Sequence, residues 1–457
     1  MKHFYNILFV LVLLAQNYCV EAPKNNICDT STLGFQDTLI LKFIISDYTP
    51  HCGFSLFGGR TVYFDLNPGY YSMPQEFFIL SRIADTKVYY TIDESYPNQQ
   101  SSLRAMAPLS IWSHAGLKIK ALGFKSGLQN SVLLEGIYSY QTLQTGQTIS
   151  YTANDDGATQ LGIKFDSFVP TASSSYPNDF ISKDKSTGLV WKSCSEGQSG
   201  PTCVGAVSNL NFADSTTACN ALNNANSGEG YSGLKTWRLP TMRELHSIND
   251  ASKVSLSLNT VAFPNSANFA YWSSTPYPTN NTFAWYVDFS NGNAYANTAT
   301  SLYHARCVAS KISQSANNFQ DNRDGTVLDN STRLIWERCT KGMTYNNGCS
   351  GTSLPDNWNI ALNYCNNLTL AGKKWRLPNR TELFTLMDFS KTGSGPTIYD
   401  AFIPGTDASF YWTSTSYVPN LPANNAWYVN FGTVSNSLYD FNSKGGSANR
   451  VRCVANE

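Results

Sequence analysis

The chain has 457 residues, of which 42% are hydrophobic, 13% aromatic and only 14% charged, and its formal net charge is zero. This length predicts about three domains. The balance of charge excludes a protein steered to nucleic acid or anionic membrane by its global field, so polyanion binding would need a local basic patch. The low charged fraction fits exported β-rich or loop-rich modules better than cytosolic enzymes.

The N-terminus has the pattern of a secretory signal, which we expect over residues 1–21. Lys2 and His3 precede an apolar core from Ile7 to Ala15. This core is too short for a stable transmembrane helix. We therefore expect an exported protein that is located at the cell surface, associated with the outer membrane, or secreted.

The eleven cysteines support export. Cys19 lies at the end of the signal and has two interpretations: a lipid-attachment cysteine that anchors the chain to a membrane, or a residue removed with the signal peptide. The residues before it, Gln-Asn-Tyr at 16–18, make a poor lipobox. The other ten cysteines form an even set, which is typical of a disulfide framework. Cys28 and Cys52 are expected to pair in a leader over residues 22–60.

Residues 61–142 alternate apolar and polar side chains as half-buried strands do, notably at Val88–Ile92 and Leu117–Ala121. This region resembles the small Ig-like module appended to chitobiases and other bacterial surface proteins. The resemblance rests on Pro68–Tyr71, Pro74-Gln75, Tyr89–Asp93, Pro97, Pro108-Leu109, Lys125–Gly127 and Tyr138. It implies a small all-β sandwich that acts as a spacer, with ligand binding as the alternative.

One stretch occurs twice, as Trp-Arg-Leu-Pro-Thr-Met-Arg-Glu-Leu at 237–245 and as Trp-Arg-Leu-Pro-Asn-Arg-Thr-Glu-Leu at 375–383. Thr241 and Asn379 are predicted N-caps, and the glutamate three residues later completes a capping box in each stretch. A repeat at this distance indicates two copies of a whole domain rather than a solenoid. We define the first copy as residues 144–310 and the second copy as residues 318–457.

The same elements follow one another in both copies. Each has an apolar strand with a Trp, two nearby cysteines, a helix with a third cysteine, the capped helix, two aromatic strands and a closing Arg-Cys-Val. This order predicts the bridges Cys194–Cys203, Cys339–Cys349, Cys219–Cys307 and Cys365–Cys453. Closing a loop as long as those of the last two bridges contributes up to roughly 4–5 kcal/mol on the chain-entropy model.

Together these elements resemble the C-terminal domain of the bacterial collagen-like adhesins called Lcl, a domain of C-type-lectin-like fold. Thr145–Thr148 with Asp155–Gly157 matches the family's usual prelude, and Asp324–Val327 matches its first hairpin, which the first copy lacks. The resemblance implies an α+β protein with two tandem C-type-lectin-like domains after the Ig-like sandwich. It also implies an adhesin for glycans, sulfated glycosaminoglycans among them, or for matrix proteins.

We find no candidate catalytic group in the sequence. The five histidines are scattered without Cys or Asp at metal-ligand spacing, and the cysteines are assigned to bridges. The same fold includes formylglycine-generating enzymes, but these need free active-site cysteines. Residues 321–325 (Asp-Asn-Arg-Asp-Gly) look like a calcium loop, yet the later bidentate Glu is missing and Asp-Gly is first a hairpin signal. We expect no enzyme activity, no metal and no other cofactor.

Recognition is expected in the loops that differ between the copies: 249–270 against 388–410, 276–283 against 416–425, and 290–303 against 432–449. The candidate ligand-binding residues are Tyr277, Asn281 and Asn293 in the first copy and Tyr417, Asn424, Asn425, Lys444 and Arg450 in the second. Tyr and Asn suit a neutral polar ligand, whereas the two cations would serve an anionic one.

The expected partner is an extracellular glycan or matrix protein, and not nucleic acid. The alternative is a structural or interaction module of the cell envelope that binds another bacterial protein. The sequence leaves the oligomeric state open.

Overall fold

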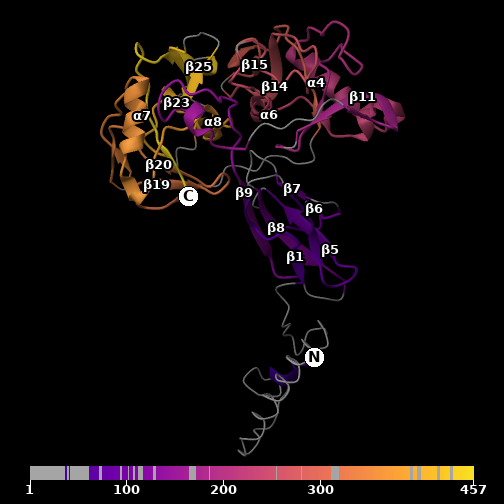
Figure 1. The fold of residues 1–457 in the computed structure, drawn as a ribbon. Helices are drawn as coiled ribbons and strands as arrows, with labels where there is room; N and C mark the ends of the chain where they lie inside the picture. The colour runs from indigo at the N-terminus through magenta and orange to yellow at the C-terminus, as the bar shows by residue number, and fades with distance from the viewer. Residues whose placement is uncertain are drawn as a thin grey trace, which may run out of the picture.

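The computed structural model describes residues 61–457, with short internal gaps, together with residues 36–38 and 41. The predicted signal segment, Cys19, Cys28 and Cys52 lie outside the described residues. Among the described helices, none is long and apolar enough to cross a membrane. An N-terminal β module is followed by two copies of an α+β domain, which lie side by side beyond it (Figure 1).

The N-terminal module, residues 61–142, is a β structure, as the alternating pattern predicts. Its strands are β1 (Val62–Phe64), β2 (Gly69–Tyr71), β3 (Gln75–Phe77), β4 (Ile79–Ser81), β5 (Lys87–Thr91), β6 (Leu103–Arg104), β7 (Leu109–Ile111), β8 (Leu117–Phe124) and β9 (Leu134–Tyr140). The main sheet has the order β2-β9-β8-β5-β6, and the pairs β1-β4 and β3-β7 share its core. A Cβ added to Gly123 would lie 2.7 Å from a methyl carbon of Val62. Glycine therefore allows β1 to approach β8 closely.

The first copy opens with an antiparallel sheet in the order β10-β11-β12-β17-β13. Its strands are β10 (Thr171–Ser173), β11 (Tyr176–Lys183), β12 (Val190–Lys192), β13 (Trp237–Arg238) and β17 (Val308–Ala309). The helical elements are α4 (Phe212–Ala221), η1 (Leu222–Asn224), α5 (Ala225–Gly228), η2 (Tyr231–Gly233) and α6 (Met242–Ser247), followed by β14 (Ala270–Pro276), β15 (Phe283–Asp288) and β16 (Asn293–Thr298). Trp191 lies opposite Val308, so the closing strand returns beside the opening one.

The second copy repeats this plan. Its first sheet has the order β18-β19-β20-β26, from β18 (Phe319–Asp321), β19 (Thr326–Asp329), β20 (Leu334–Glu337) and β26 (Val454–Asn456). The other elements are β21 (Thr344–Tyr345), β22 (Cys349–Ser350), α7 (Trp358–Asn367), η3 (Leu370–Gly372), α8 (Arg380–Thr385), β23 (Phe410–Tyr417), β24 (Asn425–Asn430) and β25 (Ser437–Ser443). Trp336 lies opposite Val454, which is the register of Trp191 and Val308 in the first copy.

Both predicted capping boxes are confirmed. Thr241 caps α6 and Asn379 caps α8, each accepting from the backbone N–H of the glutamate three residues later, whose side chain bonds back to the cap. A helix of six residues is too short to be stable alone. The caps and the burial of Leu245 and Leu383 therefore hold these two helices in place.

The four disulfides predicted for the two copies are confirmed. The short bridges are Cys194–Cys203 and Cys339–Cys349. The long bridges, Cys219–Cys307 and Cys365–Cys453, tie α4 and α7 to the residue before the closing strand of each copy.

The two copies share one six-stranded sheet in the order β14-β15-β16-β25-β24-β23 (Figure 1). At its centre β16 of the first copy pairs antiparallel with β25 of the second, with Ala294 opposite Tyr439. These strands lie within the segments 290–303 and 432–449, which the sequence comparison assigned to binding loops. That prediction is wrong for both strands, because they form the contact between the copies.

A single apolar core continues from the first copy into the second, and two arginines cross between them. Arg380 donates from Nη2 to the carbonyl oxygen of Asn249 at 2.8 Å, and Arg243 donates to that of Met387 at 2.6 Å. Asn249 and Met387 are equivalent positions just beyond α6 and α8. Carbonyls at the end of a helix lack partners in the helix and favour a nearby cation. Each copy therefore satisfies the helix end of the other.

Residues 144–163, which the sequence assigned to the first copy, contact both copies. They contain the short helix α3 (Asp156–Thr159). The carbonyl of Thr145 accepts from the N–H of Ala251 in the first copy at 2.8 Å. The carboxylate of Asp156, which is buried, accepts from the hydroxyl of Thr415 in the second copy at 2.8 Å. This segment therefore forms hydrogen bonds to both copies and holds them together.

Candidate binding regions

Four predicted residues of the second copy come together at one end of the shared sheet. Tyr417 pairs with Asn425 across β23 and β24, and Asn425 pairs with Ser443 on β25. The N–H of Lys444 donates to the carbonyl of Asn424 at 2.9 Å. We call this region the second-copy end.

Tyr417 faces the interior of the second-copy end. Its side chain is 4% exposed, stacks on Phe441 with ring centroids 3.8 Å apart, and meets the edge of Trp427 at 5.0 Å. Burial raises the pKa of its hydroxyl to about 12. The prediction that Tyr417 binds ligand is wrong, because its ring fills the space beside β24 and β25 and stabilises the fold.

Lys444 is held by groups of the protein itself. Its Nζ lies 4.0 Å from the centroid of the Trp358 ring and 5.5 Å from that of Tyr151, and it donates to the Ser416 hydroxyl at 2.7 Å. Burial lowers its pKa to about 8. Because a cation over Trp is already stabilised by the ring, this ammonium is less available to an anionic ligand than the sequence implied.

Arg450 lies at the other end of β23. Its N–H donates to the carbonyl of Phe410, the first residue of that strand, whereas Tyr417 is the last. Its Nε pairs with a carboxylate oxygen of Asp407 at 2.5 Å. The structure does not bring Arg450 and Lys444 together, so the predicted pair of cations for one anionic ligand is wrong.

Tyr277 and Asn281 lie at the corresponding end of the first copy, between β14 and β15, which we call the first-copy end. Asn281 is exposed. The half-buried ring of Tyr277 lies 4.9 Å from that of Trp285. Next to it is a shallow hollow that is also lined by Met387 and Phe389 of the second copy. The first-copy end therefore presents an amide beside a surface to which both copies contribute.

Asn293 lies in the contact between the copies. Its side chain is 2% exposed and donates to the Tyr295 hydroxyl at 2.7 Å and to the Asp440 carboxylate at 2.9 Å. The Tyr295 hydroxyl donates in turn to Asp440 at 2.7 Å. The prediction that Asn293 binds ligand is wrong, since this amide joins β16 to β25.

The two candidate ends lie at opposite ends of the strands of the shared sheet. Because β16 and β25 are antiparallel, Tyr439 is opposite Ala294 near the start of β16. The first-copy end lies beyond the other terminus of β16, where Thr298 pairs with Phe283. The second-copy end lies where β25 finishes at Ser443. The two candidate ends are therefore two separate places on the molecule.

The repeated Trp-Arg-Leu-Pro stretch is built into the helix starts. Arg238 makes a bidentate ion pair with Glu244, with contacts of 2.7 and 2.6 Å. Arg376 makes the same kind of pair with Glu382, with two contacts of 2.7 Å. Both glutamates are 2% exposed. Their oxygens are already occupied by the arginine and the cap, which supports the structural interpretation of this motif.

The comparison with known families matches this repeated architecture. The model of the Lcl C-terminal domain matches residues 181–309 and 325–455, which together make up more than half of the chain. The chain belongs to the Lcl C-terminal domain family. No curated protein and no solved structure matches it significantly. The first and second copies are thus the first and second Lcl domains.

Both Lcl domains bury the arginine of the Arg-Cys-Val motif, a role that sequence reasoning missed. Arg306 donates to the carbonyl of Ser193 at 2.5 Å, and Arg452 donates to that of Arg338 at 2.5 Å. Both side chains are fully buried, and burial lowers the pKa of both. The available signal was the recurrence of an arginine before each closing cysteine.

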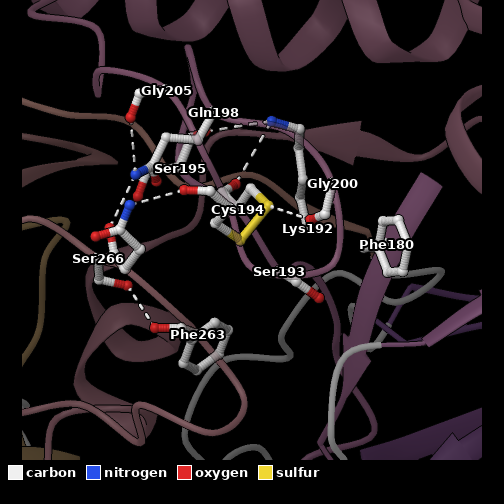
Figure 2. Close-up of a disulfide and its surroundings, with 12 residues drawn as sticks. Phe180, Lys192, Ser193, Cys194, Ser195, Gln198, Gly200, Gly205, Phe263 and Ser266 are labelled. Atoms are coloured by element: carbon white, nitrogen blue, oxygen red, sulfur yellow. Dashed lines mark hydrogen bonds between the residues drawn. A yellow bond between two sulfur atoms is a disulfide. The ribbon is translucent and has the colours of Figure 1, made fainter. Parts of the chain in front are cut away.

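A second charge is buried beside the short disulfide of the first Lcl domain, and an opposite charge is buried at the equivalent position of the second. In the first domain the ammonium of Lys192 lies next to the Cys194–Cys203 bridge, as Figure 2 shows, and pairs with Glu196 at 3.0 Å. The second Lcl domain has Glu337 at the position of Lys192, and burial raises the pKa of this carboxyl to about 7. The sign of the charge is reversed between the domains, although the surrounding fold is kept.

The predicted calcium-like loop of the second Lcl domain is a hairpin. Asp321 accepts from the N–H of Arg323 at 2.9 Å and pairs with Arg338. Asp324 accepts from the N–H and hydroxyl of Thr326 at 3.0 and 2.6 Å. Within the described part of the chain, no group of three or more His, Cys, Asp or Glu side chains could hold a metal ion.

Proposed function

We propose that the chain is an exported, non-enzymatic surface adhesin whose two Lcl domains each bind a glycan or matrix protein. The observation that carries this proposal is the position of the exposed amides of Asn281 and Asn424 at opposite ends of one shared sheet. The shared sheet and the common core join the two ends in one folded unit. A surface that carries many copies of the ligand would then engage both ends, and avidity would exceed the affinity of either end alone.

The finer fold assignment is part of the proposal: each Lcl domain is C-type-lectin-like, and the N-terminal module is an Ig-like spacer. The bridge from the first helix to the closing strand in both domains supports the first assignment. The shared core of the three groups of strands in the module supports the second.

A neutral polar ligand fits the two ends better than a sulfated glycosaminoglycan. Lys444 is engaged by Trp358 and Ser416, and Arg450 is paired with Asp407. Asn281 and Asn424, by contrast, are exposed and carry no charge. Amides both donate and accept, as recognition of hydroxyl groups requires.

The alternative is a module of the cell envelope that binds another bacterial protein. One observation favours it: Phe269 and Leu302 of the first Lcl domain are 47% and 57% exposed. Phe269 lies 5.9 Å from Tyr303, the neighbour of Leu302. These side chains offer apolar area to a protein partner. In both versions we propose location at the cell surface or outer membrane, either through a lipid on Cys19 or after secretion.

The test is binding of the exported full chain to a glycan array and to immobilised matrix proteins. The variants are Asn281→Ala, Asn424→Ala and the double variant, with Asn220→Ala on the exposed face of α4 as the matched control. We expect each single variant to weaken retention on a multivalent surface, the double variant to lose about tenfold or more, and Asn220→Ala to behave like the parent.

Binding that persists unchanged in the double variant would move recognition away from the sheet ends. If no glycan or matrix protein binds while an envelope protein is captured through Phe269 and Leu302, the alternative function replaces the first.

A further inference from the structure

A cleft of about 480 Å³ lies where the N-terminal module meets the second Lcl domain. The module contributes Ile137 and Ser139 from β9, and Gln141 directly after that strand. The opposite wall is the turn between β19 and β20, including Asn330 and Arg333. The volume is within the range of sites for small ligands, about 300–1,000 Å³.

The turn in this wall is similar in both Lcl domains but differs in sequence at two positions, where Lys185 and Gly188 of the first correspond to Asn330 and Arg333 of the second. In the first domain Asp184 accepts from Ser186 N–H at 2.8 Å, and Gly188 follows with φ +68°. In the second, Asp329 accepts from Ser331 N–H at 2.8 Å, and Arg333 follows with φ +59°.

L-residues with side chains rarely adopt this left-handed conformation, whereas glycine adopts it freely. The second Lcl domain therefore has an arginine in a left-handed conformation at the position where the first has glycine. Strained residues of this kind concentrate at binding and catalytic sites. The arginine that results lines the cleft.

Other groups of the cleft walls have hydrogen-bonding capacity to spare. Among the described residues, the side chains of Gln141 and Asn330 have no hydrogen-bond partner, and both are half-buried. Asn456 accepts from Arg376 at 3.1 Å, which leaves its amide N–H groups for a ligand. Ile137, which is 38% exposed, and Leu334 add apolar surface.

The lining of the cleft carries charges of both signs. Arg333 pairs with Glu457, with side chains 32% and 43% exposed, and Glu382 is forked by Arg376. A polyanion would meet the Glu457 carboxylate, and a polycation the Arg333 guanidinium. A ligand with many hydroxyl groups and no net charge matches amides, a guanidinium and small apolar faces together.

We infer that this cleft is a third binding site, one for a neutral oligosaccharide, with Arg333, Gln141 and Asn330 as its hydrogen-bonding residues. It is separate from the first-copy and second-copy ends, because its walls include β9, the residues directly after it, and the turn between β19 and β20.

The test uses Arg333→Gly, which removes the guanidinium and installs the residue that the first Lcl domain has at this turn. Arg323→Gly is the matched control, because Arg323 also has positive φ, at +61°, is exposed and lies outside the cleft. Both variants are made in the exported full chain with Asn281→Ala and Asn424→Ala, so that the proposed ends do not contribute.

The probes are di- to tetrasaccharides of glucose, N-acetylglucosamine, mannose and galactose, with a heparin tetrasaccharide as the anionic arm, measured by calorimetry. We expect at least one neutral probe to bind the parent and the Arg323→Gly protein equally. We expect Arg333→Gly to weaken it about tenfold or more, as loss of a charge-assisted hydrogen bond predicts, with no loss of melting temperature. Gln141→Ala should weaken the same probe.

Absence of binding by every neutral probe overturns the inference. Equal binding by the Arg333→Gly and Arg323→Gly proteins overturns it as well, and so does a preference for heparin that depends on Arg333. The proposed ends are absent from these proteins, so each of these results leaves the adhesin proposal untouched.

Discussion

Breaking the polar junction between β16 and β25 should destabilise both Lcl domains at once. The junction consists of the Asp440 carboxylate, which accepts from the Tyr295 hydroxyl at 2.7 Å and from the Asn293 amide at 2.9 Å. The perturbations are Asp440→Ala, Tyr295→Phe and the double variant.

The magnitude follows from the two hydrogen bonds. Each bond to a charged acceptor is worth about 1.5–3 kcal/mol. Burial raises the pKa of Asp440, so the charged carboxylate also carries a desolvation cost that is recovered when it is removed. We expect Asp440→Ala to cost about 2–3 kcal/mol, Tyr295→Phe about 1–2 kcal/mol, and the two to be coupled by about 1 kcal/mol or more.

The assay is urea unfolding of the exported full chain, followed by tryptophan fluorescence from both Lcl domains. Because one core continues through both domains, they should unfold in one transition, which every variant shifts as a whole. If Tyr295→Phe lowers the free energy of unfolding as much in the Asp440→Ala protein as in the parent, the two side chains are not coupled and the junction is refuted. Two separate transitions for the Lcl domains of the parent would refute the joint core.

Four further outcomes are expected. Peptide mapping of the unreduced protein should recover Cys219 joined to Cys307; any other partner contradicts the assigned fold. Glu244→Ala and Glu382→Ala should each cost about 1–3 kcal/mol of stability, from the cap and the arginine fork, and leave ligand affinity unchanged; a fall in affinity at constant melting temperature would make these stretches binding sites. Burial raises the pKa of Asp156 from 3.8 to about 6, so the folded state binds this proton more tightly than the unfolded state. The stability that the proton contributes is full below about pH 4 and is lost as pH rises through about 6. Asp156→Asn should therefore stabilise the protein at pH 8 by up to about 3 kcal/mol and flatten the dependence of melting temperature on pH, whereas an unchanged profile would assign the pH dependence elsewhere. Ligand binding should survive chelation of calcium, and its loss in chelator would require a metal site.

Local patterns predicted much of each Lcl domain. The capping boxes at Thr241 and Asn379 need only a residue and a glutamate three positions later, so the sequence suffices to place them. The bridges followed from the shared order of cysteines in the two copies. The strands β5 and β8 of the N-terminal module followed from alternation.

The contact between the Lcl domains was beyond these patterns. Strand partners are selected by long-range packing, and β16 and β25 lie in segments that share little sequence. Difference between the copies was interpreted as ligand specificity, whereas here it also reflects that each strand meets the other copy. Asn293 was misassigned for this reason. Tyr417 was misassigned because its ring packs on Phe441 and Trp427 of its own copy, and Tyr and Asn serve both in packing and in binding.

The two copies contribute different residues to their contact, and this difference decides whether the copies of one chain pair with each other or with those of another chain. The carbonyl beyond α6 is satisfied by Arg380, and the equivalent carbonyl beyond α8 is satisfied by Arg243. These arginines do not occupy equivalent positions, because Arg380 corresponds to Met242 and Arg243 to Thr381 in the aligned repeats. Two identical copies would lack one arginine of each such pair. The contact is therefore made of two different surfaces that fit each other better than themselves. This favours closure within one chain over pairing between chains, and it leaves the two sheet ends directed away from each other at a fixed separation.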